Sequence, residues 1–176
     1  MVKNMLVQRD PMRMIGSDAL DGLQNGGFAA ILARAGVGKT ALLVQLAIHA
    51  MIKEKNILHI STGNPVDKVT LWYQEVFQRL TQPYEAFQAD KLWDQLLHHR
   101  FIMTFETEAF TLDKLEKRVS ELITQDIFKP VQIMIDGFSL RNEDVARLQA
   151  LRTFAMQNQL VFWFTVRTHR EEPIEP

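Results

Sequence analysis

The chain has no cysteine, and this absence excludes disulfide bonds, thiolate catalysis and cysteine-ligated zinc. Long apolar runs are missing as well, because none approaches the ~20 residues of a membrane-spanning helix. Lys3, Arg9, Asp10 and Arg13 interrupt the N-terminal stretch, so it lacks the apolar core of a signal peptide. A cysteine-free chain also fits a reducing compartment. We therefore expect a cytoplasmic protein with no membrane span.

A strong charge of either sign is also missing. The net formal charge is −1, and the Lys and Arg residues are scattered, which argues against nucleic acid as a partner. The 176 residues suit a single domain, and no repeat or long linker divides them. We expect an N-terminal arm or lead-in strand over residues 1–15, one folded domain over 16–170 and a flexible tail over 171–176.

What the chain does have is a stretch of small residues over 33–40, which reads Ala-Arg-Ala-Gly-Val-Gly-Lys-Thr. An apolar run over 28–32 precedes it, and a helical pattern over 41–51 follows it. Strand, tight loop and helix are the context that a phosphate-binding loop requires. Small residues let successive backbone N–H groups point at anionic oxygens, and the helix start adds the positive end of its dipole.

This loop assigns roles to particular residues. Lys39 would reach the terminal phosphates of a nucleotide, and the Thr40 hydroxyl would bind magnesium. The first position of the motif is Ala33 instead of glycine, which we interpret as tolerable because the glycines of the turn are kept. The alternative is a glycine-containing turn with a chance Lys-Thr pair. The residues predicted to bind the nucleotide are Ala35, Gly36, Val37, Gly38, Lys39, Thr40 and Ala41.

Five short apolar runs predict buried strands, over 28–32, 56–61, 101–105, 131–136 and 160–166. Helical patterns lie between them, over 41–51, 66–80, 90–99, 112–123 and 142–155. Alternating strands and helices predict an α/β fold with three layers, α/β/α, around a mainly parallel sheet of about five strands.

Local signals suggest where some helices begin. Asn64 is a candidate N-cap with Pro65 at the first helical position, and Thr111 and Asn142 are candidate N-caps further on. The acidic and aromatic stretch over 81–90 is predicted to be the most flexible connection.

Asp136 ends the fourth predicted strand after an apolar run. In proteins with a phosphate loop, a carboxylate at this place orients magnesium or its water ligands. The predicted metal site therefore consists of Thr40 and Asp136. The alternative is an aspartate that only caps the turn before Gly137.

With these parts in place, the chain resembles the RecA-like ATPases, and within them the KaiC and RadA group. The resemblance covers about residues 16–167 and rests on Gly26-Gly27, on 33–40 and on 133–139. It implies that residues 16–170 form a RecA-like nucleotide-binding domain of the P-loop type, with ATP or ADP and Mg²⁺ as cofactors. It further implies a sheet in which the fifth strand lies beside the first, followed by the fourth, second and third, with ATP at the carboxyl ends of the strands.

RecA-like ATPases often place basic residues after the fifth strand, where they act on a neighbour's nucleotide. Arg167 and His169 are similar to that pattern, and Arg167 is a weak catalytic candidate; a solvated strand end is the alternative. The remaining unusual side chains are given no catalytic role, and the histidines are interpreted as structural or exposed. The histidines lack metal-ligand spacing, and core packing is expected of the tryptophans; these residues are His59, His98, His99, Trp72, Trp93 and Trp163.

The resemblance fails where hydrolysis would be catalysed. RecA-like ATPases usually keep a glutamate at the end of the second strand, and many related ATPases place it directly after the magnesium aspartate instead. Here the second strand ends without an acid, and Gly137 follows Asp136. Asp67, in the first turn of the next helix, is the best substitute, and Glu106 follows the more distant third strand. We therefore expect hydrolysis to be weak or absent without a partner.

The leading hypothesis is an ATP-binding protein whose nucleotide state controls assembly, as a homo-oligomer, or binding of a protein partner. An active oligomeric RecA-like ATPase is the alternative from the enzyme class. A small-molecule kinase fits less well because the segment between the third and fourth strands lacks an arginine-rich lid. A DNA-acting recombinase would need basic loops after the fourth and fifth strands, and only Arg141 and residues 167–170 offer charge there.

Overall fold

The centre of the molecule is a sheet of five parallel strands in the order β1-β5-β4-β2-β3. We analysed a computed structural model, which describes residues 2–8, 23, 26–139 and 145–167. All five strands lie where apolar runs predicted them, and their order is the one that the family resemblance implied. The strands are β1 (Phe28–Ala33), β2 (Ile57–Thr62), β3 (Arg100–Phe105), β4 (Gln132–Phe138) and β5 (Val161–Arg167).

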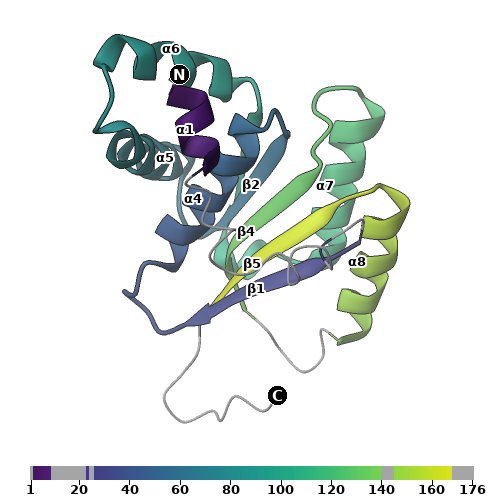
Figure 1. The fold of residues 1–176 in the computed structure, drawn as a ribbon. Helices are drawn as coiled ribbons and strands as arrows, with labels where there is room; N and C mark the ends of the chain where they lie inside the picture. The colour runs from purple at the N-terminus through teal and green to yellow at the C-terminus, as the bar shows by residue number, and fades with distance from the viewer. Residues whose placement is uncertain (1, 9–22, 24–25, 140–144, 168–176) are drawn as a thin grey trace.

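Helices cover both faces of this sheet, which confirms the predicted three-layer α/β/α fold (Figure 1). On one face lie α4 (Lys39–Ile52) and α5 (Val66–Thr81), with α1 (Val2–Gln8) and α6 (Ala86–Leu97) packed beside them. On the other face lie α7 (Leu112–Thr124) and α8 (Val145–Gln157). A short 3₁₀ turn, η1 (Thr107–Ala109), follows β3. In the described ranges, no helix combines the length and the apolar character needed to cross a bilayer.

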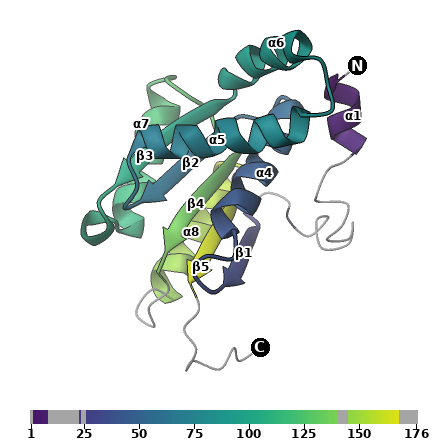
Figure 2. The same cartoon turned by 90° about the vertical axis from the view of Figure 1, so that its left-hand side faces the viewer.

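Among the described helices, α4 is the most buried. Within its last ten residues, from Leu43 to Ile52, only Gln45 is not buried. Helices α1, α5 and α6 surround α4 together with the sheet (Figure 2). A helix enclosed in this way holds its first turn, which follows the glycine loop, firmly against the sheet.

The opposite face of the sheet has its own core. Leu58, Ile60 and Ile133 pack there against α7 and α8. Aromatic rings join β1, β4 and β5 on this side, with Phe28 5.4 Å from Phe164 and Phe138 5.0 Å from Phe164 between ring centroids. Each such side chain stabilises the fold by about 1.5–3 kcal/mol when fully buried. Two cores therefore fix the sheet, and with it the carboxyl ends of its strands.

The described part of the N-terminal arm, residues 2–8, forms a helix and not the strand that was considered there. Val2 and Leu6 of α1 are buried in the core around α4, and Lys3 Nζ lies 2.7 Å from Glu54 Oε1. The spacing of Val2 and Leu6 places both side chains on one helical face, which explains why a helix forms here. The rest of the expected arm and the expected tail over 171–176 lie outside the described residues.

Two of the predicted helix starts can be checked. Thr111 caps α7, where its hydroxyl accepts a hydrogen bond of 3.3 Å from the Lys114 N–H. The prediction for α5 was wrong, because Pro65 occupies the N-cap position and Asn64 lies outside the helix. Proline has φ −71° here and needs no donor at a helix start, so it takes the cap one residue later. The predicted start at Asn142 lies outside the described residues.

The stretch over 81–90, predicted to be flexible, is mostly helical. Helix α6 begins at Ala86, four residues before the predicted 90–99 segment, and only residues 82–85 connect it to the end of α5. Ala89 of this stretch is buried and packs in the core with Leu92 and Leu96. The sequence pattern missed this turn because alanine is a weak apolar marker.

Candidate functional site

The glycine loop joins β1 to α4, as the sequence predicted. Gly36 has φ +81° and Gly38 has φ +92°, and a side-chain carbon added at either would meet no atom within 4 Å. Glycine is therefore needed for backbone conformation and not for space. Ala33 is the last residue of β1 and is not among the positive-φ residues, which explains why the motif tolerates alanine at this position.

The loop presents both backbone and side-chain donors. Helix α4 begins at Lys39 without a side-chain cap, so its first N–H groups have no partner within the helix. Lys39 Nζ donates hydrogen bonds of 2.7 Å to the carbonyl oxygens of Ala33 and Arg34. This places the ammonium group across the loop, where its charge and the helix dipole both favour an anion.

Thr40 and Asp136 are brought together by the fold. The Thr40 hydroxyl donates a hydrogen bond of 2.8 Å to Asp136 Oδ2, although 96 positions separate the two residues. Asp136 lies on β4, two strands from β1, and its side chain points toward the helical layer that contains α4. The two residues predicted as a metal pair are therefore direct neighbours.

Asp136 is held by a hydroxyl that sequence reasoning did not assign a role. Thr165 of β5 donates a hydrogen bond of 2.6 Å to Asp136 Oδ1 and accepts one of 2.8 Å from the Gly137 N–H. The pairing of β4 with β5 shifts between Ile135 and Phe138, and Gly137 adopts φ +87° at this irregularity. Such a bulge redirects a side chain at the end of a strand. The only sequence signal for Thr165 was a polar residue inside an apolar run.

A carboxylate in this position suits a cation. Asp136 is only 6% exposed, and in the described part of the chain neither Lys nor Arg forms an ion pair with it. A buried carboxylate without a positive partner is costly. Next to it, the buried Ser61 hydroxyl has no hydrogen-bond partner, and Ser61 pairs with Asp136 in the sheet register. Carboxylate and hydroxyl oxygens are the donors that magnesium prefers.

The fit to magnesium has a limit that the structure makes clear. Among the described residues, no group of three or more His, Cys, Asp or Glu side chains could hold a metal by itself. Magnesium typically uses one or two protein ligands together with substrate phosphates and water. Thr40 and Asp136 therefore fit a metal that arrives with a phosphate ligand, and do not form an all-protein cage.

A cavity of about 360 Å³ lies between the loop and α5. Gly36, Gly38 and Lys39 to Ala41 form one wall, and the side of α5 that bears Trp72 and Val76 forms the other. The volume falls in the range of small-ligand sites. Trp72, which we expected to be a core residue, is half-buried and lines this cavity, with Lys68 Nζ 5.4 Å from its ring centroid.

The weak catalytic candidates lie in different places. Asp67 is exposed in the first turn of α5, and no hydrogen bond among the described residues joins it to the loop or to Asp136. Arg167 is the last residue of β5 and pairs with Ala33 in the sheet, so its backbone lies beside the start of the loop. His169 lies outside the described residues. Glu106 follows β3, four strands from β1 and about 19 Å away at the usual strand spacing.

The buried histidine of β2 is structural, as expected. His59 Nδ1 lies 3.1 Å from the Tyr73 hydroxyl, and the Arg100 guanidinium lies 4.6 Å from the centre of the Tyr73 ring. Burial lowers the pKa of His59 to about 4, the nearby Asp136 opposes this shift, and Arg100 adds to it. Burial also raises the pKa of Tyr73 and lowers that of Arg100. His59 is therefore neutral near pH 7 and forms no hydrogen bond with Asp136.

Comparison of the chain with protein-family models finds no match, and comparison with curated proteins also finds none.

Proposed function

We propose that the chain binds ATP or ADP together with Mg²⁺ through the glycine loop and Asp136. The nucleotide phosphates would lie against Ala35 to Ala41, with Lys39 at the terminal phosphates. Thr40 would bind the metal directly, and Asp136 would hold it directly or through water. The observation that carries this proposal is the 2.8 Å hydrogen bond between Thr40 and Asp136, because it joins the loop to a buried carboxylate.

The surroundings of this pair support the same ligand. Anionic phosphates match the uncapped start of α4 and the Lys39 ammonium, and a divalent cation matches the buried Asp136. Neither half suffices alone, since many proteins have a helix start or a buried acid. The fold itself is shared by proteins of many functions, so the proposal depends on these side chains and not on the strand order.

We further propose that intrinsic hydrolysis is weak or absent and that the nucleotide controls assembly or partner binding. In-line attack on the terminal phosphate needs a polarised water. Among the described residues, no Asp or Glu other than Asp136 forms a hydrogen bond or ion pair with Thr40, Lys39 or Asp136, and Asp67 is exposed to solvent. Arg167 ends β5 at the carboxyl edge, and in an oligomer it would act on a neighbour's nucleotide. An active oligomeric ATPase remains the second candidate, with Asp67 as its base.

Titration calorimetry with ATP and ADP, in Mg²⁺ and in EDTA, tests the binding proposal. The Lys39→Ala variant should lose binding at least about 100-fold, since it removes a charged hydrogen-bond donor worth ~3 kcal/mol. Lys117→Ala, which changes an exposed lysine of α7, is the matched control and should bind normally. Equal affinity of Lys39→Ala and the parent would disprove the site assignment.

Turnover and assembly are measured separately. Phosphate release by the pure protein should stay far below the ~10 s⁻¹ typical of enzymes, with Lys39→Ala as the control for contaminating ATPases. Light scattering with and without ATP tests assembly, and a protein that stays monomeric at high concentration in both states would contradict it. Binding of DNA that weakens with salt would favour the recombinase alternative instead.

A further inference from the structure

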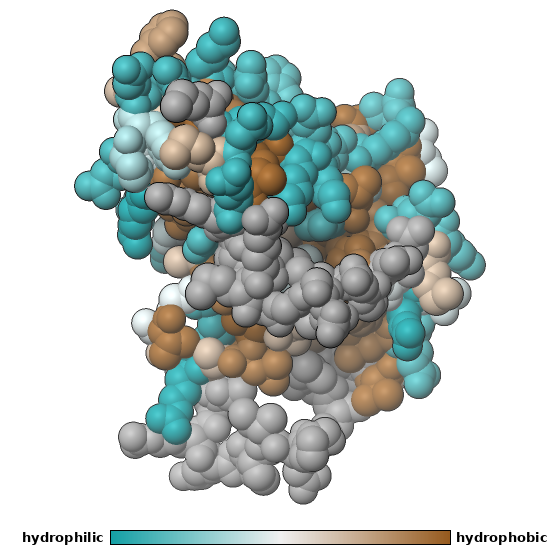
Figure 3. Space-filling model, viewed as in Figure 1, coloured by the Kyte–Doolittle hydropathy of each residue, from teal (hydrophilic) through white to brown (hydrophobic). Residues whose placement is uncertain are grey.

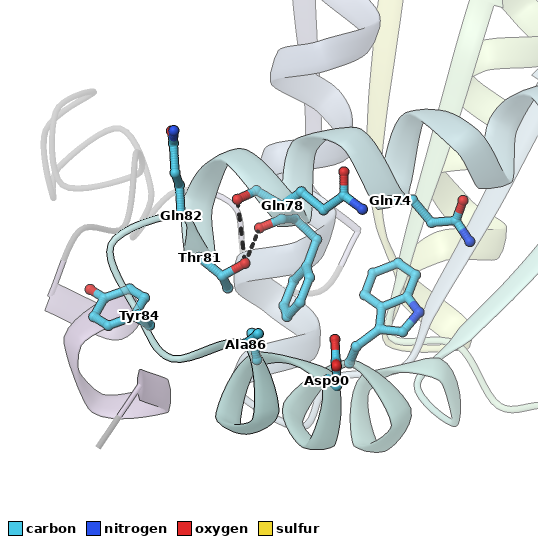
Figure 4. Close-up of a pocket in the computed structure, with 10 residues that line it drawn as sticks. Gln74, Gln78, Thr81, Gln82, Tyr84, Ala86 and Asp90 are labelled. Carbon is cyan, nitrogen blue, oxygen red and sulfur yellow. Dashed lines mark hydrogen bonds between the residues drawn. The ribbon is translucent and has the colours of Figure 1, made fainter.

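A second hollow of the molecule lies away from the glycine loop, between α5 and α6 (Figure 4). It has a volume of about 510 Å³, large enough for several residues of a ligand chain. We call it the glutamine groove. Its lining residues are Gln74, Phe77, Gln78, Thr81, Gln82, Tyr84, Ala86, Ala89, Asp90 and Trp93.

The glutamine groove continues along α5 toward the loop. A smaller hollow shares Gln78 and Gln82 with it, and shares Glu75 and Arg79 with the cavity beside the loop. The three hollows therefore follow one another along the exposed side of α5. From Trp72 to Gln82 the helix rises about 15 Å, the length of four to five residues of extended chain. An elongated ligand fits this shape better than a compact one.

Three glutamines define the chemistry of the groove. Gln74, Gln78 and Gln82 recur at every fourth position of α5 and its C-cap, and all three are exposed. In Figure 4 the side chains of Gln74 and Gln78 lie along α5 on one side of the groove, Gln82 extends from the end of α5 away from α6, and Asp90 extends from α6. A carboxamide donates and accepts hydrogen bonds at once, as a peptide unit does. Four residues of helix, slightly more than one turn, rise about 6 Å, and two residues of extended chain span about 6.6 Å. The spacing of the glutamines along α5 therefore matches the spacing of every second peptide unit of an extended chain.

The floor of the groove is aromatic. The rings of Phe77 and Trp93 lie 4.9 Å apart, and the Arg100 guanidinium lies 5.7 Å from the Trp93 ring. Thr81 donates to the carbonyl oxygens of its own helix, at 2.8 Å to Phe77, so its hydroxyl is already engaged. An apolar side chain would fill the space above these rings.

Charge narrows the class of ligand further. Asp90 is exposed, and no described residue forms an ion pair with it. Among the described residues that line the three hollows, Arg79 is the only cation outside the glycine loop. Its guanidinium lies 3.7 Å from the Glu75 carboxylate. A phosphate backbone would therefore find no free positive partner there. The surface over α6 is mostly hydrophilic in Figure 3, which does not suit an acyl chain. A cationic side chain on the ligand would complement Asp90.

We propose that the glutamine groove binds an extended polypeptide segment of a partner protein. The segment carries an apolar side chain that packs on Phe77 and Trp93, and a Lys or Arg two positions away that pairs with Asp90. Gln74, Gln78 and Gln82 bond to its main chain. This inference goes beyond the proposed nucleotide site, since the groove needs no nucleotide to bind a peptide.

The experiment uses the full chain and a labelled synthetic nonapeptide, Gly-Ser-Thr-Leu-Ser-Arg-Thr-Ser-Gly, without nucleotide. Binding is followed by fluorescence anisotropy, and its place by NMR shifts of glutamine side-chain amides and of the Trp93 indole. Two further probes change one feature each. One replaces Arg by Glu, and the other carries N-methyl groups on alternate peptide nitrogens. Both should bind at least about tenfold more weakly.

Two variants and one control test the residues. Gln74→Ala with Gln78→Ala should weaken the peptide about fivefold for each amide lost. Asp90→Lys should weaken the Arg peptide and strengthen the Glu peptide, an exchange that a general loss of structure would not produce. Gln149→Ala changes an exposed glutamine on α8 and should bind as the parent does. Circular dichroism checks that each variant is folded.

Some results would overturn the proposal. These are no shift of the groove signals at about 1 mM peptide, equal binding of the Arg and Glu peptides, or displacement of the peptide by a single-stranded oligonucleotide or by anionic vesicles. Repeating the titration with Mg-ATP separates the two proposals. Peptide binding with the same affinity in the presence and absence of Mg-ATP supports the groove and counts against control by the nucleotide. Failure of the peptide titration rejects the groove, and failure of the nucleotide titration rejects the nucleotide site, each independently of the other.

Discussion

The Thr165 hydroxyl donates a hydrogen bond of 2.6 Å to Asp136 Oδ1, while it accepts the Gly137 N–H at 2.8 Å. The Thr165 side chain on β5 thus provides a hydrogen-bond partner at the irregularity of β4 and orients the Asp136 carboxylate toward Thr40. The orientation of Asp136 is set by this contact, since Thr40 bonds the other oxygen at 2.8 Å. The candidate site is therefore formed by the ends of β1, β4 and β5 together with the start of α4.

Replacing Thr165 by Val should destabilise the fold by about 1–3 kcal/mol, because the buried Asp136 Oδ1 and the Gly137 N–H both lose a partner. Urea unfolding measures this loss. Under our functional proposal, affinity for Mg-ATP should also fall, while affinity for ATP in EDTA changes less. Thr165→Ser keeps the hydroxyl and should restore both properties; a serine variant as weak as the valine variant would contradict the role given to the hydroxyl.

Replacing Asp136 by Asn should separate stability from metal binding. Without Mg²⁺ the variant should be as stable as the parent or more stable by about 1–2 kcal/mol, because a buried charge without a cation is removed. The increase in melting temperature caused by Mg-ATP should shrink strongly. Thermal unfolding in EDTA and in Mg-ATP tests both statements. A variant that loses stability in EDTA yet keeps the full Mg-ATP effect would show that Asp136 is structural.

Gly137 and Gly36 offer a matched pair of substitutions. Both have positive φ, +87° and +81°, but a side-chain carbon at Gly137 would lie 2.6 Å from Thr62 Oγ1 and 3.2 Å from the Thr62 carbonyl oxygen. Gly36→Ala should therefore cost about 1–2 kcal/mol from backbone strain alone, and Gly137→Ala should cost clearly more. Urea unfolding without nucleotide compares them, and equal losses would mean that Thr62 moves aside at no cost.

The stability of the protein should depend on pH through His59. Its pKa is about 4 in the folded protein, against an ordinary 6.5. Between these values the unfolded chain binds a proton that the folded chain does not, so stability falls as pH drops from 6.5 to about 4. The loss approaches ~3 kcal/mol, at 1.36 kcal/mol per pH unit. It reflects burial of His59 beside Tyr73 and Arg100, partly offset by Asp136.

A histidine variant isolates this effect from the acid titration of carboxylates. His59→Gln keeps a polar partner for Tyr73 and should flatten the dependence of unfolding free energy on pH in this window. His98→Gln, at an exposed position, should leave it unchanged. Urea titrations at several pH values provide the measurement, and an unchanged slope in His59→Gln would refute the assignment.

Much of the fold followed from local pattern in the sequence. Five apolar runs were long enough for strands, and helical segments separated them. A helix between two strands carries the chain back to the end of the sheet where the first strand began, so the next strand runs parallel to it. The backbone freedom of Gly36 and Gly38 was likewise encoded locally, which is why the loop was found at the predicted place. Asp136 was found for a similar reason, as a lone acid at the end of an apolar run.

Other features had no local cause. The helix over residues 2–8 depends on α4, because Val2 and Leu6 are buried only where they pack in the core around that helix. Helix α6 begins four residues before the predicted segment because Ala89 is buried in the core formed with its neighbouring helices. The sequence predicted a core position for Trp72, but whether a half-buried ring lines a cavity depends on the neighbouring loop and not on its own helix.

The sequence by itself determined which residue types were available, namely a flexible glycine loop, a lysine and a threonine at a helix start, and an acid at a strand end. Only the tertiary structure decided which of them meet. Strand order placed β5 between β1 and β4, and this brought Thr165 to Asp136 and Asp136 to Thr40. Hydrogen bonds act over about 3 Å, so contacts between residues tens of positions apart exist only after the sheet has fixed their register.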